Sequence, residues 1–385
     1  MKRTVGLCFV LILVVSCTTG CWNLKEPDEV AFVVGAGLDL TKDGQLELSS
    51  QIAIPSSLGG GQEGGGGIMK QNFRVESSIG KNVYDTVPRN QTKISRKIFA
   101  GHRQIILVGQ TMAEHGISDV LDQFVRLPQS ELRSKMYVVK DGQAKDILST
   151  EPSFEPLTST ALVLEQKTLG LKSYYFREFL TDTLSQGVQP LLPAISLTAS
   201  KKLMYTGTAI FNKDDGLKLA GFLNMQESSI ANWITNRQTH FTVTSTITEG
   251  GTVSLKLQSL SRSIRASMVG KQIHIFVHLT GEGIIFENNT KFNPSKRKDL
   301  LIIQNELDQT TQKSVQLLIE KVQKQYKTDI FGFGKTVHRQ YPYQWKTVKR
   351  NWNETFSKLH VSITVELHCV DPGQANSSIM NMHTS

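Results

Sequence analysis

The run LHVSITVELHC (359–369) alternates strictly between apolar and polar side chains. Its apolar positions are Leu359, Val361, Ile363, Val365, Leu367 and Cys369. Successive side chains of an extended chain point to opposite faces, so a period of two is typical of a strand with one buried face. The pattern therefore predicts a half-buried strand over 359–370. Cys369 falls on the apolar face, which favours a buried structural thiol over a reactive one.

A long helical pattern precedes this strand. Within 296–327, apolar residues recur at steps of three and four and form one stripe: Ile303, Leu307, Val315, Leu318, Ile319, Val322 and Tyr326. Such steps place side chains on one face of an α-helix. The stripe and the apolar face of the strand both need a partner. We therefore expect this amphipathic helix to pack on a C-terminal sheet that strand 359–370 completes.

Hairpin patterns dominate the rest of the chain. VAFVVGAGLDL (30–40) and QLELSSQIAIP (45–55) flank a turn that contains Asp43-Gly44, and Asp-Gly between two apolar runs favours a hairpin. LMYTGTAIF (203–211) and LKLAGFL (217–223) predict a second one. Strands in runs, joined by hairpins and faced by helices, indicate an α+β fold with antiparallel or mixed sheets.

Helical and extended patterns alternate between and after the hairpins. The expected elements are strands at 104–109 and 135–142, helices at 80–90, 118–126, 158–187 and 225–236, and at least three strands between 239 and 286. Pro190 and Pro193 mark a boundary after the third of these helices. GGGQEGGGG (59–67) lacks the Lys-Ser/Thr of a phosphate loop and predicts a flexible surface loop.

The first twenty residues have the pattern of an export signal. Lys2 and Arg3 carry two positive charges, and residues 5–15 are apolar apart from one glycine. A membrane-spanning helix needs about 20 apolar residues, which this run does not reach. The run ends in LVVSCTTGCWN (13–23), where small residues precede two cysteines. This is the pattern of a bacterial lipoprotein, whose signal is cleaved before a diacylglycerol-modified cysteine; the alternative is an ordinary cleaved signal with incidental cysteines.

Two cysteines compete for that modification. Cys17 matches the lipoprotein signal pattern better. Val14 supplies the aliphatic residue expected three positions before it, whereas Thr18 takes that place for Cys21. Two or more acyl chains on either thiol would hold the mature chain stably at a membrane. Lipidation of Cys21 would leave Cys369 as the last thiol and exclude an intramolecular disulfide.

The chain thus divides into a signal peptide at 1–20, an N-terminal α+β region at 21–200 that suits one domain or two subdomains, a C-terminal α+β domain at 201–371 and a polar tail at 372–385. It is basic, with a formal net charge of +9. Cleavage after residue 20 removes two basic groups and no acid, which leaves +7. On an exported chain this excess favours an anionic lipid surface or acidic partners over nucleic acid.

Motifs of catalysis and metal binding are absent from the sequence. It has no Gly-x-Ser-x-Gly, no His-Glu-x-x-His and no paired-Cys spacing. GFGKT (332–336) resembles part of a P-loop, but Asp329 stands where the first glycine is required, so we expect a Lys-Thr in a turn. His274 and His278 alternate on a predicted strand and would lie about 13 Å apart, too far to share one ion. We therefore expect no enzyme, no cofactor and no metal site.

The segment KTVHRQYPYQWKTVKRNWNETF (335–356) mixes basic and aromatic residues. We expect an amphipathic helix that buries Trp345, Val348, Trp352 and Phe356 and leaves Lys346, Lys349 and Arg350 in water. A membrane-proximal or partner surface is the alternative interpretation of the same residues.

Together these segments resemble the C-subunit lipoproteins of bacterial spore germinant receptors, the GerABKC lipoprotein family. CWNLKEPDEVAFVVGAGLDL (21–40) is similar to the family's opening Cys-Trp-Asp and its strand ending in Gly-x-Gly-x-Asp. Residues 102–148, 207–234 and 322–352 resemble further family blocks in the same order. The family modifies the cysteine that precedes Trp, so the resemblance favours Cys21; Asn23 in place of Asp and the weak Thr18 are departures, and Cys17 stays the alternative.

The resemblance implies a non-catalytic role. Such a protein would sit on the outer surface of the spore inner membrane, with integral-membrane A and B subunits as partners, and help a nutrient trigger germination. No direct small-molecule ligand is expected, because the nutrient is thought to engage the B subunit. The alternative is a free-standing extracytoplasmic solute-binding lipoprotein.

Overall fold

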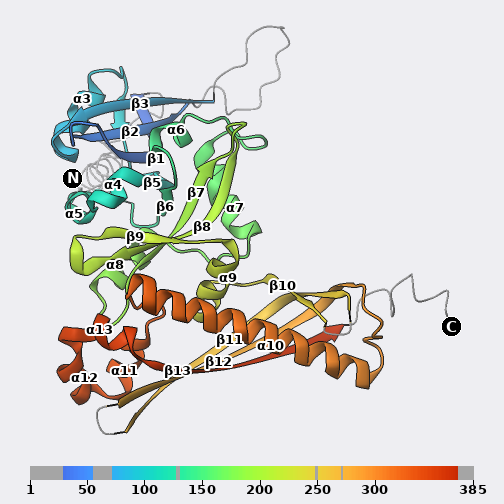
Figure 1. Cartoon of the computed structure of the whole chain (residues 1–385). Coiled ribbons are helices and arrows are strands. Elements are labelled where there is room, and N and C mark those ends of the chain that lie inside the picture. The colour runs from blue at the N-terminus through green and yellow to red at the C-terminus, as the bar shows by residue number, and fades with distance from the viewer. Residues whose placement is uncertain (1–28, 55–71, 127–130, 248–249, 270–271, 372–385) are drawn as a thin grey trace, which may run out of the picture.

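The computed structural model describes residues 29–54, 72–126, 131–247, 250–269 and 272–371. These residues form an α+β fold with two mixed sheets, which confirms the expected class (Figure 1). The signal peptide, Cys17, Cys21, the glycine run 59–67 and the tail 372–385 lie outside the described residues.

The first sheet has nine strands and is parallel at its centre. Its strands, in spatial order, are β3 (Phe73–Gly80), β2 (Leu46–Ala53), β1 (Val30–Leu40), β5 (Ile105–Gly109), β6 (Lys135–Val139), β7 (Leu191–Leu197), β8 (Leu203–Asn212) and β9 (Lys218–Leu223), with β4 (Lys97–Phe99) also paired to β1. β1, β5, β6 and β7 are parallel neighbours, whereas β1–β2 and β8–β9 are the two antiparallel hairpins that the sequence predicts.

Helices cover this sheet, and both faces of its central strands are buried. The helices are α3 (Val83–Gln91), α4 (Gln110–His115), α5 (Ser118–Arg126), α6 (Ala144–Leu148), α7 (Thr158–Thr168) and α8 (Phe176–Leu184). Ile106 and Val108 of β5 enter one core, and Ile105 and Leu107 enter the other. A continuous apolar run such as β5 is what a central parallel strand requires. The expected helix over 158–187 is two helices, α7 and α8.

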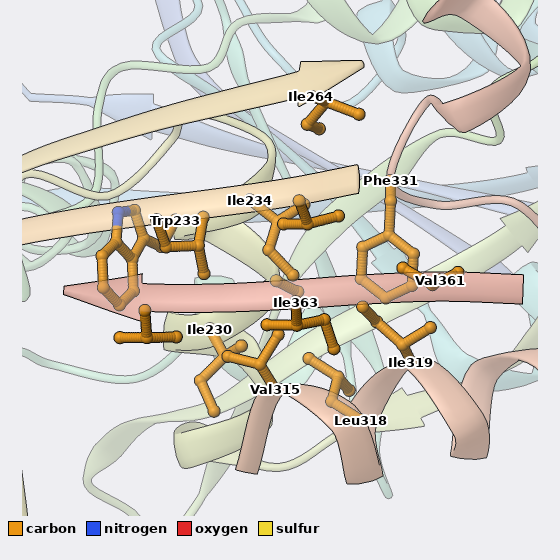
Figure 2. Close-up of a cluster of buried hydrophobic side chains, with 14 of the residues drawn as sticks. Ile230, Trp233, Ile234, Ile264, Val315, Leu318, Ile319, Phe331, Val361 and Ile363 are labelled. Carbon is orange, nitrogen blue, oxygen red and sulfur yellow. The ribbon is translucent and has the colours of Figure 1, made fainter. Parts of the chain in front are cut away.

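The second sheet has four strands: β10 (Phe241–Thr246), β11 (Thr252–Val269), β12 (Gln272–Asn288) and β13 (His360–Asp371). β13 buries Val361, Ile363, Val365 and Leu367 and pairs in parallel with β12. The helix α10 (Arg297–Lys321), extended by a π-helical turn over Val322–Tyr326, lies along the sheet (Figure 1). Its side chains Val315, Leu318 and Ile319 face Val361 and Ile363 of β13 (Figure 2), which confirms the predicted packing.

The two sheets are joined through α9 (Met225–Ile234), which confirms the short helix predicted at 225–236. Ile230, Trp233 and Ile234 of α9 lie in the same core as α10 (Figure 2). The Trp233 indole Nε1 donates to the Ser261 carbonyl of β11 at 3.0 Å. The second sheet thus begins only after α9. The hairpin 203–223, which the sequence analysis placed in the second domain, continues the first sheet through β7, and Pro193 lies inside β7 opposite Thr208.

Two local expectations in the C-terminal part are wrong. Segment 335–356 is not one helix but α11 (Phe333–Gln340), α12 (Pro342–Val348), the 3₁₀ turn Lys349–Asn351 and α13 (Trp352–Ser357). Pro342 has no backbone N–H, so it starts a new helix and ends the previous one. Lys335 and Thr336, which were expected in a turn, lie in the helix α11. Trp345, Trp352 and Phe356 are buried as expected.

Candidate functional site at the junction of the two sheets

The Gly-x-Gly-x-Asp stretch of β1 forms the surface on which α6 packs. A Cβ on Gly35 would lie 2.9 Å from Leu148 Cδ2, and one on Gly37 would lie 3.1 Å from Ala144 Cβ. Only glycine lets α6 approach β1 this closely. Asp39 then caps the helix, because its carboxylate accepts the backbone N–H groups of Ala144 at 2.8 Å and Lys145 at 3.0 Å. This motif therefore serves the fold.

The Asp39 carboxyl links stability to pH. Burial raises the pKa of Asp39 from 3.8 to about 6. Between these values the folded chain holds a proton that the unfolded chain has lost, so the free energy of unfolding falls as pH rises through this window. We expect wild-type stability, relative to Asp39→Asn, to drop by roughly 2 kcal/mol between pH 4 and pH 6.5. Urea unfolding at both pH values measures it; a difference that stays constant, or rises, would contradict the assignment.

The matched control for this pH effect is Asp141→Asn. Asp141 is an exposed residue in the turn after β6, close in sequence to the α6 cap. Because the side chain is exposed, this replacement should leave the free energy of unfolding within about 0.5 kcal/mol of wild type at each pH.

Asp329 occupies a nest of backbone amides at the start of α11. Its Oδ1 accepts the N–H groups of Phe331, Gly332 and Phe333 at 3.1, 2.9 and 3.2 Å. Its Oδ2 accepts Gly334 N–H at 2.7 Å and Trp352 Nε1–H at 2.9 Å. Successive N–H groups at a helix start form a concavity that attracts anions. In the P-loop-like GFGKT stretch, the chain's own carboxylate takes the place that a phosphate takes in a P-loop.

This nest also fastens the first sheet to the second part of the chain. The Asp329 carbonyl accepts Gln189 N–H at 2.7 Å, and the Gly187 carbonyl accepts Lys335 N–H at 3.0 Å. A Cβ on Gly334 would lie 2.7 Å from the Gly187 Cα, so the two backbones touch. The loop before β7 and the start of α11 thus form one packed junction.

A cleft of about 760 Å³ opens beside this junction. The α8–β7 loop forms one wall, and the segment from α12 to α13 forms the other, where Lys349 and Arg350 line the cleft. Asp214 lies in it and accepts Gln189 Nε2–H at 2.7 Å and Asn353 Nδ2–H at 3.1 Å. These amides and charges can hold a polar group. Among the described residues, no three His, Cys, Asp or Glu side chains gather as metal ligands.

The other residues singled out from the sequence lie away from the cleft. On the second sheet, His274 Nε2 lies 2.9 Å from His360 Nδ1, a cross-strand pair that the sequence analysis missed because β13 follows β12 by more than seventy residues. His278 lies 3.9 Å from Glu366 and is part-exposed. Cys369 is half-buried against the core, and burial raises the pKa of its thiol, which favours the unreactive form.

The candidate lipidation residues cannot be placed in this site. Cys21 and its alternative Cys17 both precede the first described residue, Glu29. None of the described helices is long and apolar enough to cross a membrane. The cleft itself was not foreseen, since it depends on contacts between residues about 140 positions apart, such as Asp214 and Asn353.

Comparison with known proteins matches almost the whole chain. A family model described as "Spore germination protein N-terminal domain" covers residues 23–197, and one described as "Spore germination B3/ GerAC like, C-terminal" covers 206–373. Putative spore germination protein YfkR of Bacillus subtilis (strain 168) is 28% identical over 373 residues, which span 94% of this chain and 95% of that protein. Spore germination protein KC of the same organism is 25% identical over 406 residues, 98% of each chain.

A solved structure shares the fold. The crystal structure of the GerBC protein superposes with a TM-score of 0.57 at 19% identity, over 90% of this chain and 100% of that one. The two family models identify the chain as a member of a class of spore germination proteins. Within it, the chain belongs to the GerAC-like family of germinant-receptor C subunits.

Proposed function

We propose that this protein is a lipid-anchored, non-catalytic subunit of a nutrient germinant receptor. It acts with integral-membrane A and B subunits to trigger spore germination. The match of both family models, in order and over nearly the whole chain, carries this proposal. The absence of catalytic motifs in the sequence agrees with a role in assembly or signalling.

The anchor places the protein on the outer surface of the spore inner membrane. Its support is the signal pattern of residues 1–20 followed by Cys21-Trp22, together with the cost of releasing acyl chains into water, about 0.8 kcal/mol per methylene. A tether of this kind raises the local concentration of the folded part near membrane-embedded partners without any new contact.

Replacing Cys21 tests the anchor. We expect Cys21→Ala to shift the protein from the membrane to the soluble fraction of disrupted spores and to slow nutrient-triggered germination. Fractionation with immunodetection and the fall in optical density of germinating spores measure the two effects. Cys17→Ala is the matched control and should leave both unchanged. Full membrane retention and normal germination of Cys21→Ala would refute the anchor at this residue, and loss with Cys17→Ala instead would move it to Cys17.

A second candidate function is that of a free-standing solute-binding lipoprotein. The cleft of about 760 Å³ favours it, because small-molecule sites have volumes of this order. It predicts saturable heat on titration of residues 22–385 with amino acids or sugars. The receptor-subunit proposal predicts none from the isolated chain.

A further inference from the structure

The helices α11 and α12 and the turn that follows carry a strongly basic surface. Residues 330–353 contain no Asp or Glu but five Lys or Arg residues, all with exposed side chains. We call the group the basic cap: Lys335, Arg339, Lys346, Lys349 and Arg350, with Tyr343. The nearest acid along the chain after it, Glu354, is bound to Lys358 at 2.7 Å.

Three of these cations lie close together in the chain. Lys349 and Arg350 follow Lys346 by three and four residues, across the end of α12 and the 3₁₀ turn Lys349–Asn351, and all three residues are exposed. Trp345 and Trp352 of the same segment are buried in the core, which holds the segment in place.

None of these three cations forms an ion pair within the described part of the chain, although Lys349 and Arg350 line the cleft that also contains Asp214 and Glu354. No described carboxylate pairs with Lys346, Lys349 or Arg350; the neighbour of Lys346 Nζ is the Tyr343 ring, 5.7 Å away at its centroid. Tyr343 itself is 80% exposed, unusual for a large aromatic residue. Unpaired cations beside an exposed aromatic ring are the combination that binds the interfacial region of bilayers, where rings sit at the level of the headgroups.

The segment that carries the basic cap packs at the end of the first sheet where its parallel strands begin. β1, β5, β6 and β7 are parallel, so all four begin at one edge of the first sheet. The segment just before β7 contacts the start of α11 and Trp345, whose Nε1 donates to Gln186 Oε1 at 2.7 Å. Eight residues lie between Cys21 and Val30, the first residue of β1. β1 and β7 therefore begin at the same end of the first sheet.

We propose that the basic cap is a second membrane contact, which binds the phosphate headgroups of an anionic lipid bilayer. With the lipid anchor it would fix the orientation of the folded part on the membrane and determine which faces meet the other subunits. This orienting role rests on the proposed anchor, but the binding of the cap to lipid does not. An acidic protein surface is the competing ligand, and a cap that meets only protein would bind no lipid vesicles.

The test uses the mature chain from residue 21 with Cys21→Ser, so that no acyl chain contributes. We expect it to cosediment with vesicles of phosphatidylcholine containing 40% phosphatidylglycerol, and not with pure phosphatidylcholine vesicles. Each Lys or Arg near such a surface contributes about 1 kcal/mol, so Lys346→Gln, Lys349→Gln and Arg350→Gln together should lower the partition coefficient about 100-fold. Binding of the unsubstituted chain should vanish in 0.5 M salt.

The matched control removes the same charge elsewhere. Lys42, Lys167 and Lys313 are exposed residues of a turn, α7 and α10, and their joint replacement by Gln should change the partition coefficient less than about threefold. Circular dichroism melting checks that both triple variants stay folded. Equal losses from both would show a general charge effect and overturn the proposal, as would failure of the unsubstituted chain to bind anionic vesicles. Because this chain is unlipidated, either result leaves the Cys21 anchor untouched.

Discussion

Replacement of Asp329 by Asn is expected to lower the free energy of unfolding by about 3–5 kcal/mol. Burial raises the pKa of Asp329 to about 6, so the carboxylate is ionised at pH 7.5 in the nest of five N–H donors. An amide is nearly isosteric, but whichever way it is turned its NH₂ group faces donors. Buried donors then lose their acceptor, and each unsatisfied group costs about 1–3 kcal/mol. Urea denaturation at pH 7.5 measures the change.

Two further variants sharpen this prediction. Trp352→Phe removes one of the five donors and keeps most of the ring, so it should cost less than Asp329→Asn, about 1–3 kcal/mol. Asp43→Asn changes an exposed turn residue in the same way and should stay within about 0.5 kcal/mol of wild type. If Asp329→Asn also stayed within that range, the nest would not contribute measurably to the free energy of unfolding.

Replacement of Gly109 by Ala is expected to cost about 2–4 kcal/mol. The new Cβ would lie 2.0 Å from Asp39 Oδ1, so the carboxylate must leave the amides of Ala144 and Lys145. Gly109 has φ −63° and ψ 151°, angles that alanine adopts freely, so backbone strain adds nothing. Chemical denaturation of variant and wild type at pH 7.5 gives the difference.

A double-mutant cycle identifies the cause of this loss. In an Asp39→Ala background the clash partner is gone, so Gly109→Ala should cost much less than in wild type. Gly142→Ala is the control, because a Cβ there would meet only Val139 Cγ1 at 3.4 Å, an ordinary contact. Equal costs of Gly109→Ala in both backgrounds would show that Asp39 is not the group displaced.

Several elements of the fold, the two hairpins and the packing of α10 on β13 were accessible from the sequence, but the order of the strands in the first sheet was not. Periods of two and of 3.6 identify β13 and α10, because burial of one face imposes them on adjacent residues. The order of the strands in the first sheet cannot be inferred from such periods. β5 is apolar at every position, and such a run does not reveal that β1 and β6 flank it. Pairing between distant segments leaves no periodic signal in either one.

The candidate site shows the same division. GFGKT resembles part of a P-loop, but Asp329 departs from that pattern, so the sequence predicted only a turn. Only the structure shows that Asp329 is itself the anion bound by this backbone. The chain turns back after Asp329, so that the N–H groups of Gly332 and Gly334 reach its carboxylate. The exposure of Lys346, Lys349 and Arg350 was expected from the sequence, whereas the break of their segment at Pro342 was not.

The placement of β8 and β9 has a consequence for exchanging parts between relatives. The matched family regions separate between residues 197 and 206, yet β8 and β9 hydrogen-bond into the sheet formed by the earlier region. A chimera spliced at residue 200 would assemble that sheet from two different parents, with mismatched side chains along β7 and β8. A crossover in the Arg237–His240 stretch, after α9, would instead take all strands of each sheet from one parent.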